Sequence, residues 1–300
     1  MADTLNQTLV TQFTDMVMHK AQQKESFFRG RVIQKPVKGK KFDYQNLGAG
    51  TNKQITSRHQ AITFGSPQHT RRGAIIQGYY EAWPFDRQDD LQSLIELESP
   101  YVDAMAKMMA RTYDAVVAEA ALGSVLTGEN MTTSTTFAND EGNTVTASSG
   151  LTYDKLREVL EQFYKRGVGL SADEKLYLAV TEKEHSTLLD QVEVISADYR
   201  KKDDIVVDKG RVSHVLGMDV IVFPSSPLVG SPIINAESAT VNNCFAFAAD
   251  GICVGINSDI EITVENRTDL VDTKQVKALF RLAALRTEGS RVVKIDVTNS

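Results

Sequence analysis

The sequence has little cysteine and no long apolar stretch. Its 300 residues include two cysteines, Cys244 and Cys253, nine positions apart in an apolar, strand-like segment. No metal-ligand spacing surrounds them, so we expect two buried thiols, which suits a reducing cytoplasm. The first residues show no basic-then-apolar signal pattern, and no stretch approaches the roughly 18 apolar residues of a membrane span.

The linear motifs of common enzyme classes are also missing. There is no Gly-x-Ser-x-Gly elbow, Walker loop, His-Glu-x-x-His helix or Cys-x-x-Cys pair. The Gly-rich segment 48–53 lacks the spacing that wraps amide groups round a phosphate. The five histidines are scattered and never stand three or four residues from another histidine or a cysteine. We therefore expect no catalytic, metal or cofactor site, although catalytic groups can also be assembled from distant positions.

Charge is divided unevenly along the chain. The net charge is −6, yet residues 1–80 hold 12 Lys and Arg against four Asp and Glu. The remaining 220 residues are strongly acidic in compensation. Such asymmetry is typical of nucleic-acid binding or of an arm that lies on another copy of its own body. Weak aromatic interleaving and a pI of about 5.5 disfavour sequence-specific nucleic-acid binding.

The first 84 residues predict two peripheral segments. Residues 2–24 have apolar side chains at helical spacing, which predicts a short amphipathic helix packed on its own domain or on a neighbour. From Gly30 to Trp83, glycines and lysines punctuate short extended pieces such as 62–64 and 74–80. These pieces predict a long, polar, two-stranded hairpin. It has too few apolar residues for a core of its own and needs a partner surface.

A long helix is the clearest local prediction. Ser99 is a good N-cap, Pro100 suits the first helical position, and apolar residues continue at helical spacing until Gly123. Residues 100–122 should therefore form one helix whose methionines pack in the core. The acidic segment before it, 86–98, is a shorter helix or a loop, and its aspartates are solvated charges or a cation site.

The second half predicts mixed helices and strands. Residues 127–149 are polar and read as an exposed loop or small hairpin, where an insertion would be tolerated. Thr152 should cap a helix that closes at Gly167, and Thr181 and Glu184 have capping-box spacing for another helix to about Gln191. The remaining segments have strand patterns. They are 176–180, 210–224 as a hairpin, 245–249, 260–265, 276–285 and 292–297.

The order of these segments is similar to the Hong Kong 97 type capsid fold of tailed phages and encapsulins. Two stretches carry most of the resemblance: SPYVDAMAKMMARTYDAVVAEAALG at 99–123 and FAFAADGICVGINSDIEITVENRTDLVDTKQVKALFRLAALRTEGSRVVKI at 245–295. The resemblance implies an α+β fold. Its expected parts are an N-terminal arm at 1–34, an E-loop hairpin at 35–84, a peripheral domain with its spine helix at 85–150, an axial domain at 151–258, and returning C-terminal strands at 259–300.

The resemblance also implies a function. The chain would be a major capsid protein that forms hexamers and pentamers of an icosahedral head enclosing double-stranded DNA, assembled in the host bacterial cytoplasm. Its partners would be itself, a portal protein and packaged DNA through non-specific contact, with no membrane. Some relatives have a long, charged, helical N-terminal extension that acts as a scaffold. This chain lacks one, which implies a separate scaffolding protein.

The expected contact between subunits follows from charge. Residues 81–119 hold nine acidic and three basic side chains, and the cationic hairpin would lie across this region of the next subunit. The candidate contact residues are Lys38, Lys40, Lys41, Arg71, Arg72, Asp86, Asp89, Asp90, Glu96 and Glu98. Two alternatives remain open at this point: an encapsulin-like compartment and a cytoplasmic enzyme with an unrecognised site.

Overall fold

A computed structural model describes residues 25–48, 50–86, 98–147, 150–171, 173–191, 205–208, 210–223, 241–267, 269 and 273–298. By contacts between residues the chain divides into two compact units. The described residues of unit 1 lie within 25, 78–111 and 258–281, and those of unit 2 within 26–77, 112–257 and 282–298. The predicted helix at 2–24 and most of the acidic segment 86–98 lie outside the described residues.

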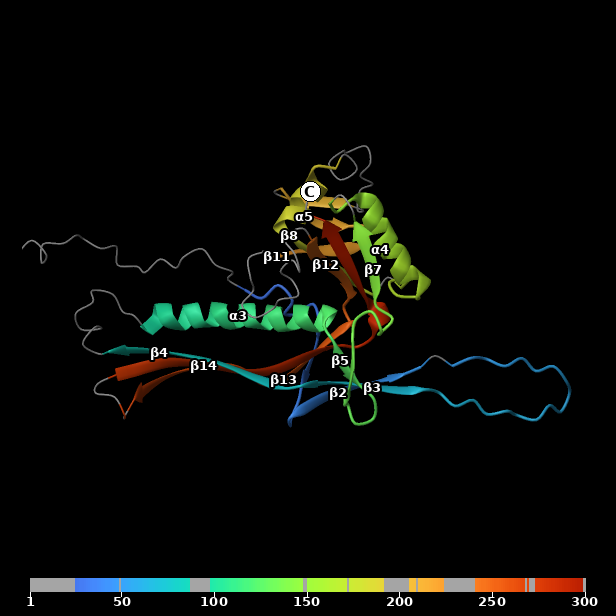
Figure 1. The fold of residues 1–300 in the computed structure, drawn as a ribbon, viewed down its shortest axis with the longest axis horizontal. Coiled ribbons are helices and arrows are strands. Elements are labelled where there is room, and N and C mark those ends of the chain that lie inside the picture. The colour runs from blue at the N-terminus through green and yellow to red at the C-terminus, as the bar shows by residue number, and fades with distance from the viewer. Residues whose placement is uncertain are drawn as a thin grey trace, which may run out of the picture. The chain divides into compact units, whose positions relative to one another are not determined.

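Unit 2 contains a seven-stranded mixed sheet with the order β7-β15-β12-β8-β11-β10-β9. Figure 1 labels its strands β7, β12, β8 and β11. Its central strand β8 runs parallel to β11 and antiparallel to β12, and β12 runs antiparallel to β15. The strands are β7 (Asn143–Ala147), β8 (Leu176–Thr181), β9 (Ile205–Asp208), β10 (Arg211–Val215), β11 (Met218–Phe223), β12 (Val241–Ala248) and β15 (Val292–Thr298). A short 3-10 turn, η1 (Gly289–Arg291), precedes β15.

Helix α4 (Tyr153–Lys165) packs an apolar face against this sheet. The Thr152 side chain accepts a hydrogen bond from the Lys155 N–H, and Leu156, Val159 and Phe163 are buried. At the other end the Val168 N–H bonds back to the Phe163 carbonyl, which closes the helix. The predicted cap, apolar face and end of this helix are confirmed.

The next helix, α5 (Glu182–Leu189), begins without the predicted capping box. Thr181 makes no side-chain cap bond, and its buried hydroxyl has no hydrogen-bond partner. The Glu184 carboxylate instead accepts a hydrogen bond from the Leu151 N–H at 3.2 Å. The predicted helix and its start at Thr181 are confirmed, but the side-chain capping bond is absent, and tertiary packing places the Glu184 carboxylate against Leu151.

The predicted hairpin at 210–224 is present as β10 and β11. Val215 pairs with Met218 across the two-residue turn Leu216-Gly217, where both residues have positive φ. That geometry matches the right-handed twist of adjacent strands. The strand predicted at 245–249 is also confirmed, as the buried part of β12.

The segment 127–149 differs from the prediction of an exposed, insertion-tolerant loop. Strands β5 (Val125–Thr127) and β6 (Thr133–Thr135) form a small hairpin, as expected, and they belong to a four-stranded sheet with the order β2-β3-β5-β6. Residues 143–147, however, form an edge strand of the large sheet, parallel to β15, with Val145 buried. The sequence did not indicate this strand because most of its residues are polar.

Unit 1 is built from parts of three long strands and the first half of a helix. The strands β4 (Gln77–Asp86), β13 (Ile252–Arg267) and β14 (Thr273–Arg286) belong to a sheet with the order β1-β13-β14-β4, in which β1 is Ile33–Pro36. Val276, Ala278 and Phe280 alternate along β14 as buried residues. Trp83 of β4 packs edge-on against Tyr101 of the helix, with ring centroids 5.9 Å apart.

The predicted long helix is α3, Glu98–Leu122. It starts two residues earlier than expected, and Met105 and Met109 are buried, as predicted. In its unit 2 part, the buried Asp114 carboxylate accepts hydrogen bonds from Ser26, Phe27 and Phe28 at 2.5 to 3.2 Å. Three bonds to one carboxylate fix the segment around Phe28 on the helix.

Both cysteines are free and buried, as predicted. Burial raises the pKa of Cys244 to about 12 and that of Cys253 to about 11. Their thiols are therefore poor nucleophiles at neutral pH.

The buried His185 gives a pH prediction. Its Nε2 accepts a hydrogen bond from the Val212 N–H at 3.0 Å, which only the neutral ring can do. Burial, and then the charge of Arg211, lower the pKa of His185 below 6.5. The unfolded chain therefore takes up the proton first as pH falls, so this contribution to stability is complete above about pH 6.5 and declines below it. We expect the urea midpoint of the unassembled chain to fall between about pH 7 and pH 5, and His185→Gln to reduce that slope. Equal slopes would contradict the assignment.

Candidate functional site

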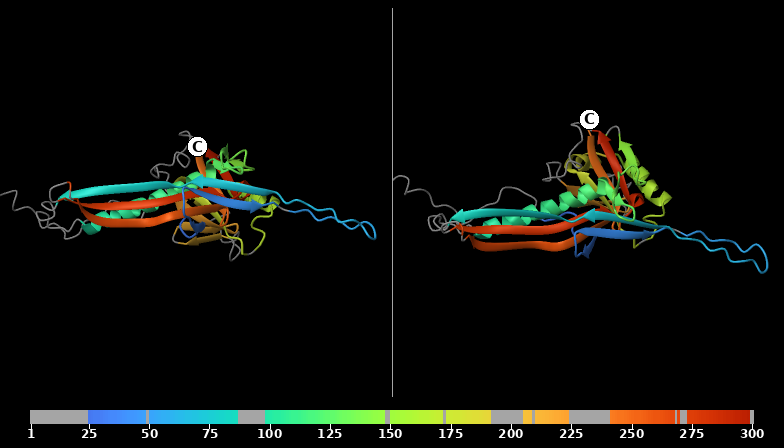
Figure 2. Two further views of the ribbon diagram at one scale, coloured as in Figure 1. Left: turned by 90° about the horizontal axis from the view of Figure 1, so that it is seen from below. Right: turned by 60° about the horizontal axis from the view of Figure 1, so that its bottom comes forward.

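A long hairpin projects from the body of unit 2, and we call residues 41–75 the hairpin arm (Figure 1; Figure 2 shows it in two further views). Strands β2 (Lys41–Leu47) and β3 (His69–Ile75) pair antiparallel along their whole length. Beyond them the Gly48 N–H donates to the Gln68 carbonyl at 2.7 Å. The described residues of 48–68, the arm tip, contain no strand, so the extended piece expected at 62–64 is not paired as a strand.

The arm tip exposes large apolar side chains. Ile55, Ile62 and Phe64 are 82%, 83% and 92% exposed, and Lys53 donates to the Thr63 carbonyl and hydroxyl at 3.1 and 3.0 Å. No acidic residue occurs between positions 44 and 80. A cationic ribbon that displays apolar side chains has the chemistry of a contact surface.

The base of the arm packs tightly on the body. Phe42 of β2 is buried in a small cluster with Val125, Cys253 and Leu285. Its ring lies so close to Gly255 of β13 that an added Cβ there would be 2.7 Å from the ring. A side chain at position 255 would therefore push the ring, and the arm with it, away from β13.

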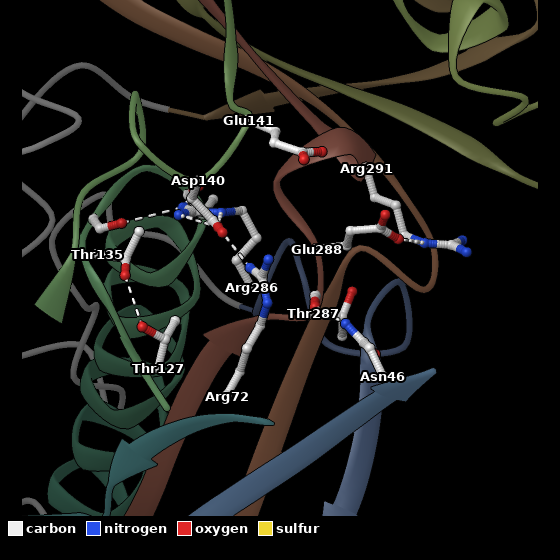
Figure 3. Close-up of polar contacts among 12 residues, drawn as sticks. Asn46, Arg72, Thr127, Thr135, Asp140, Glu141, Arg286, Thr287, Glu288 and Arg291 are labelled. Carbon is white, nitrogen blue, oxygen red and sulfur yellow. Dashed lines mark hydrogen bonds and ion pairs between the residues drawn. The ribbon is translucent and has the colours of Figure 1, made fainter. Parts of the chain in front are cut away.

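A buried ionic network ties the arm to the body, and we call Arg72, Asp140 and Arg286 the base network (Figure 3). Asp140 Oδ2 accepts from Arg72 Nη1 at 2.5 Å and from Arg286 Nε at 2.9 Å. Arg286 is fully buried, donates through Nη1 to the Ala121 and Gly123 carbonyls, and lies over the Phe137 ring at 4.9 Å. Burial lowers the pKa of Arg286, and the charge of Asp140 opposes that effect.

A polar cavity of about 390 Å³ lies beside the base network. Arg72 lines it together with Glu141, Asp250, Glu288 and Arg291. Arg291 forms ion pairs with Asp250 and Glu288, while Asn46 Nδ2 donates to the Thr287 carbonyl at 2.5 Å. Burial alone would raise the pKa of Glu288, but hydrogen bonds from Ser290 and Arg291, and the charges of Arg291 and Arg72, lower it overall.

The structure separates the cationic candidate residues into two groups. Lys38, Lys40 and Lys41 are exposed around the turn between β1 and β2. Arg71 pairs with Asp43 inside the arm at 3.0 Å, and Arg72 belongs to the base network. Both arginines thus already have partners within the chain.

The acidic candidates are less well defined. Asp86 and Glu98 lie at the ends of β4 and α3, and only their backbone is described. Asp89, Asp90 and Glu96 fall outside the described residues. Sequence reasoning missed Asp140 and Arg286, which are 146 positions apart and have no shared motif.

The described part of the chain has neither a metal-binding cluster nor a long apolar helix. No group of three or more His, Cys, Asp or Glu side chains there has an arrangement that could hold a metal ion. Within the same residues, no helix is both long and apolar enough to cross a membrane.

The chain is similar to known phage capsid proteins. A family model described as "Phage capsid protein" matches residues 5–299. Curated protein sequences give no match. The capsid of cyanophage P-SCSP1u superposes with a TM-score of 0.73 at 15% identity, covering 99% of this chain and 95% of that one. The mature capsid of bacteriophage PhiM1 gives 0.71 at 14%, covering 97% and 93%. The capsid of a native gene transfer agent particle gives 0.68 at 12%, covering 99% and 98%. At these identities the structural matches establish a shared fold.

Proposed function

This chain belongs to the phage capsid protein family, as the major capsid protein of a tailed phage, and we propose that its copies join through hexamers and pentamers into an icosahedral head around double-stranded DNA. Self-association into a capsid lattice is what the family and the fold imply. The encapsulin and enzyme alternatives are not favoured. We also propose that the chain divides into an N-terminal arm, an E-loop hairpin, a peripheral domain, an axial domain and returning C-terminal strands. Their residues are 1–34, 35–84, 85–150, 151–258 and 259–300.

The observation that carries the proposal is the hairpin arm. Its tip exposes Ile55, Ile62 and Phe64 and has no acidic residue. We propose that the arm lies across the acidic region 81–119 of the next copy, including the candidates Asp86, Asp89, Asp90, Glu96 and Glu98. Opposite charges would set the register, and the apolar side chains would supply affinity. Closure over many copies turns modest contacts into a stable shell.

Further partners complete the proposal. A separate scaffolding protein would guide assembly in the host bacterial cytoplasm, a portal protein would occupy one vertex, and the inner surface would contact packaged DNA without sequence preference. The chain would act as a structural protein without cofactor or catalytic role.

The mass of the purified chain tests the function. We expect light scattering and electron microscopy on the same fractions to show megadalton shells, or rings of five and six copies of the 33.1 kDa chain, alone or with the candidate scaffolding protein. A chain that stays a monomer or dimer under both conditions would contradict the proposal and favour the enzyme alternative.

Charge reversal tests the role of the exposed lysines. We expect Lys38→Glu, Lys40→Glu and Lys41→Glu together to leave the subunit folded and to block assembly, because the exposed basic turn that leads into the arm would then repel an acidic neighbour. Arg71 and Arg72 are left intact because both are paired within the chain. The control reverses Arg157, Lys165 and Lys175, which are exposed on and after α4 and give the same change in net charge. Arg157 and Lys165 also lose exposed ion pairs to Asp154 and Glu161, so the control disturbs the subunit at least as much as the lysine variant does. If sedimentation shows that the triple lysine variant forms normal shells, the charge argument is wrong.

A further inference from the structure

The base network contains two positive charges and one negative charge. Two guanidinium groups share the single carboxylate of Asp140, and both approach the same oxygen, Oδ2. The side chains of Arg72, Asp140 and Arg286 are 12%, 6% and 0% exposed. Because like charges repel strongly away from water, Arg286 offsets part of the attraction between Arg72 and Asp140.

The two arginines belong to different parts of unit 2. Arg286 is held by the carbonyls of Ala121 and Gly123 as well as by Asp140, so it stays in place whatever the arm does. Arg72 lies on β3, within the arm. If Arg72 leaves, Asp140 and Arg286 still neutralise one another, and no unpaired buried charge remains.

Two further carboxylates line the same cavity as Arg72. The cavity that Arg72 lines also has Glu141 and Glu288 in its wall. Glu141 is 80% exposed, with Arg166 at 3.9 Å as a weak partner, and Glu288 is 44% exposed. The charge of Arg72 already acts on Glu288, whose pKa it helps to lower.

Few other polar contacts hold the paired part of the arm on the body. Strand β3 pairs with β5 at two positions, Arg72 with Thr127 and Gly73 with Leu126. Beyond these, Asn46 donates to the Thr287 carbonyl, and Arg71 donates to the Glu129 carbonyl at 3.3 Å. Among the described residues, the Arg72 ion pair is thus one of a small number of polar contacts that hold the arm, beside the apolar packing of Phe42 at its base.

We propose that the Arg72–Asp140 ion pair is a releasable latch for the hairpin arm. In the latched state Arg72 binds Asp140 and the arm is held on the body, as in Figure 3. In the released state the ion pair to Asp140 is broken, and the arm beyond Phe42, which stays in its apolar cluster, turns about its short pairing with β5. In the native chain the freed Arg72 then lies in the cavity against Glu288 or Glu141. The proposal concerns the single chain and stands whether or not the arm contacts a neighbouring copy.

Distances between two spin labels test the latch. Ser57 in the arm tip and Ser171 on the body are exposed and lie in the same unit. Ser57→Cys and Ser171→Cys would be labelled in the full chain, at concentrations where sedimentation shows single subunits. The native thiols of Cys244 and Cys253 are buried and should stay unlabelled. Pulsed electron spin resonance then reports the distribution of distances between arm and body.

Three variants distinguish a latch from a purely structural ion pair. Arg72→Gln removes the arm's half of the pair while Asp140 keeps Arg286, so the chain should fold. We expect the released population to rise about fivefold, the ratio that corresponds to about 1 kcal/mol. Glu141→Gln with Glu288→Gln removes the alternative partners and should lower that population by a similar factor. Val159→Ala weakens the core at α4, away from the arm, and should leave the distances unchanged.

Three outcomes would overturn the proposed latch. An unchanged distance distribution in Arg72→Gln, with a lowered unfolding midpoint, would make Arg72 a structural residue only. An unchanged distance distribution in the double glutamine variant would show that Glu141 and Glu288 do not hold Arg72 in the released state. A shift in Val159→Ala as large as in Arg72→Gln would mean that the arm follows overall stability.

Discussion

Replacing Asp140 with alanine should lower the free energy of unfolding by about 3 to 5 kcal/mol, because it leaves the buried Arg286 guanidinium without its counter-charge. Arg286 is fully buried, and its remaining hydrogen-bond partners are carbonyl oxygens, which carry no compensating charge. Urea unfolding of the unassembled chain, followed by circular dichroism, measures this loss. A change this large would be about a fifth or more of the stability of a typical domain.

Two variants separate the buried charge from a general effect of losing an aspartate. Asp154→Ala removes a carboxylate that is 87% exposed and 3.5 Å from Arg157, and it should change stability by no more than about 0.5 kcal/mol. Asp140→Ala combined with Arg286→Met also removes the fully buried guanidinium, whereas Arg72 is 12% exposed and lines the polar cavity. The double variant should therefore be less destabilising than Asp140→Ala alone. If the double variant is the less stable of the two, the argument from an unpaired charge fails.

Replacing Ile55, Ile62 and Phe64 with serine should abolish assembly without destabilising the subunit. All three side chains are more than four-fifths exposed in the single chain, so they contribute little to its folding. If each is buried on a neighbouring copy, at about 1.5 kcal/mol or more apiece, the three changes weaken one arm contact by about 4 to 5 kcal/mol. That is roughly three decades in the association constant of each contact.

The measurement combines the unfolding midpoint with sedimentation of assembled particles. Leu170→Ser is the matched control, since Leu170 is 66% exposed but lies after α4 rather than in the arm. Shells formed in normal yield by the triple variant would show that the arm tip does not contribute affinity. The arm would then act through its charges alone.

Local signals accounted for much of the fold. The α4 helix was predicted with its cap, apolar face and end, because Thr152 and the apolar face from Leu156 to Phe163 act within one stretch of chain. Strands β8, β12, β13, β14 and β15 and the β10–β11 hairpin followed from alternation and turn residues. The predictions that failed concerned contacts between residues that are distant in the sequence. Glu184 had the spacing of a capping box, yet its carboxylate is used by the Leu151 N–H.

The sequence by itself determined the order of most elements, the stretch 44–80 without acidic residues and the resemblance to the capsid family. These depend on local pattern and composition, which a linear reading contains in full. Only the tertiary structure decided which charges are free to meet another copy: it leaves Lys38, Lys40 and Lys41 exposed but pairs Arg71 with Asp43 and Arg72 with Asp140. The physical reason is that an ion pair between residues 68 or 146 positions apart depends on how strands are brought together, and neither partner marks the other in the sequence.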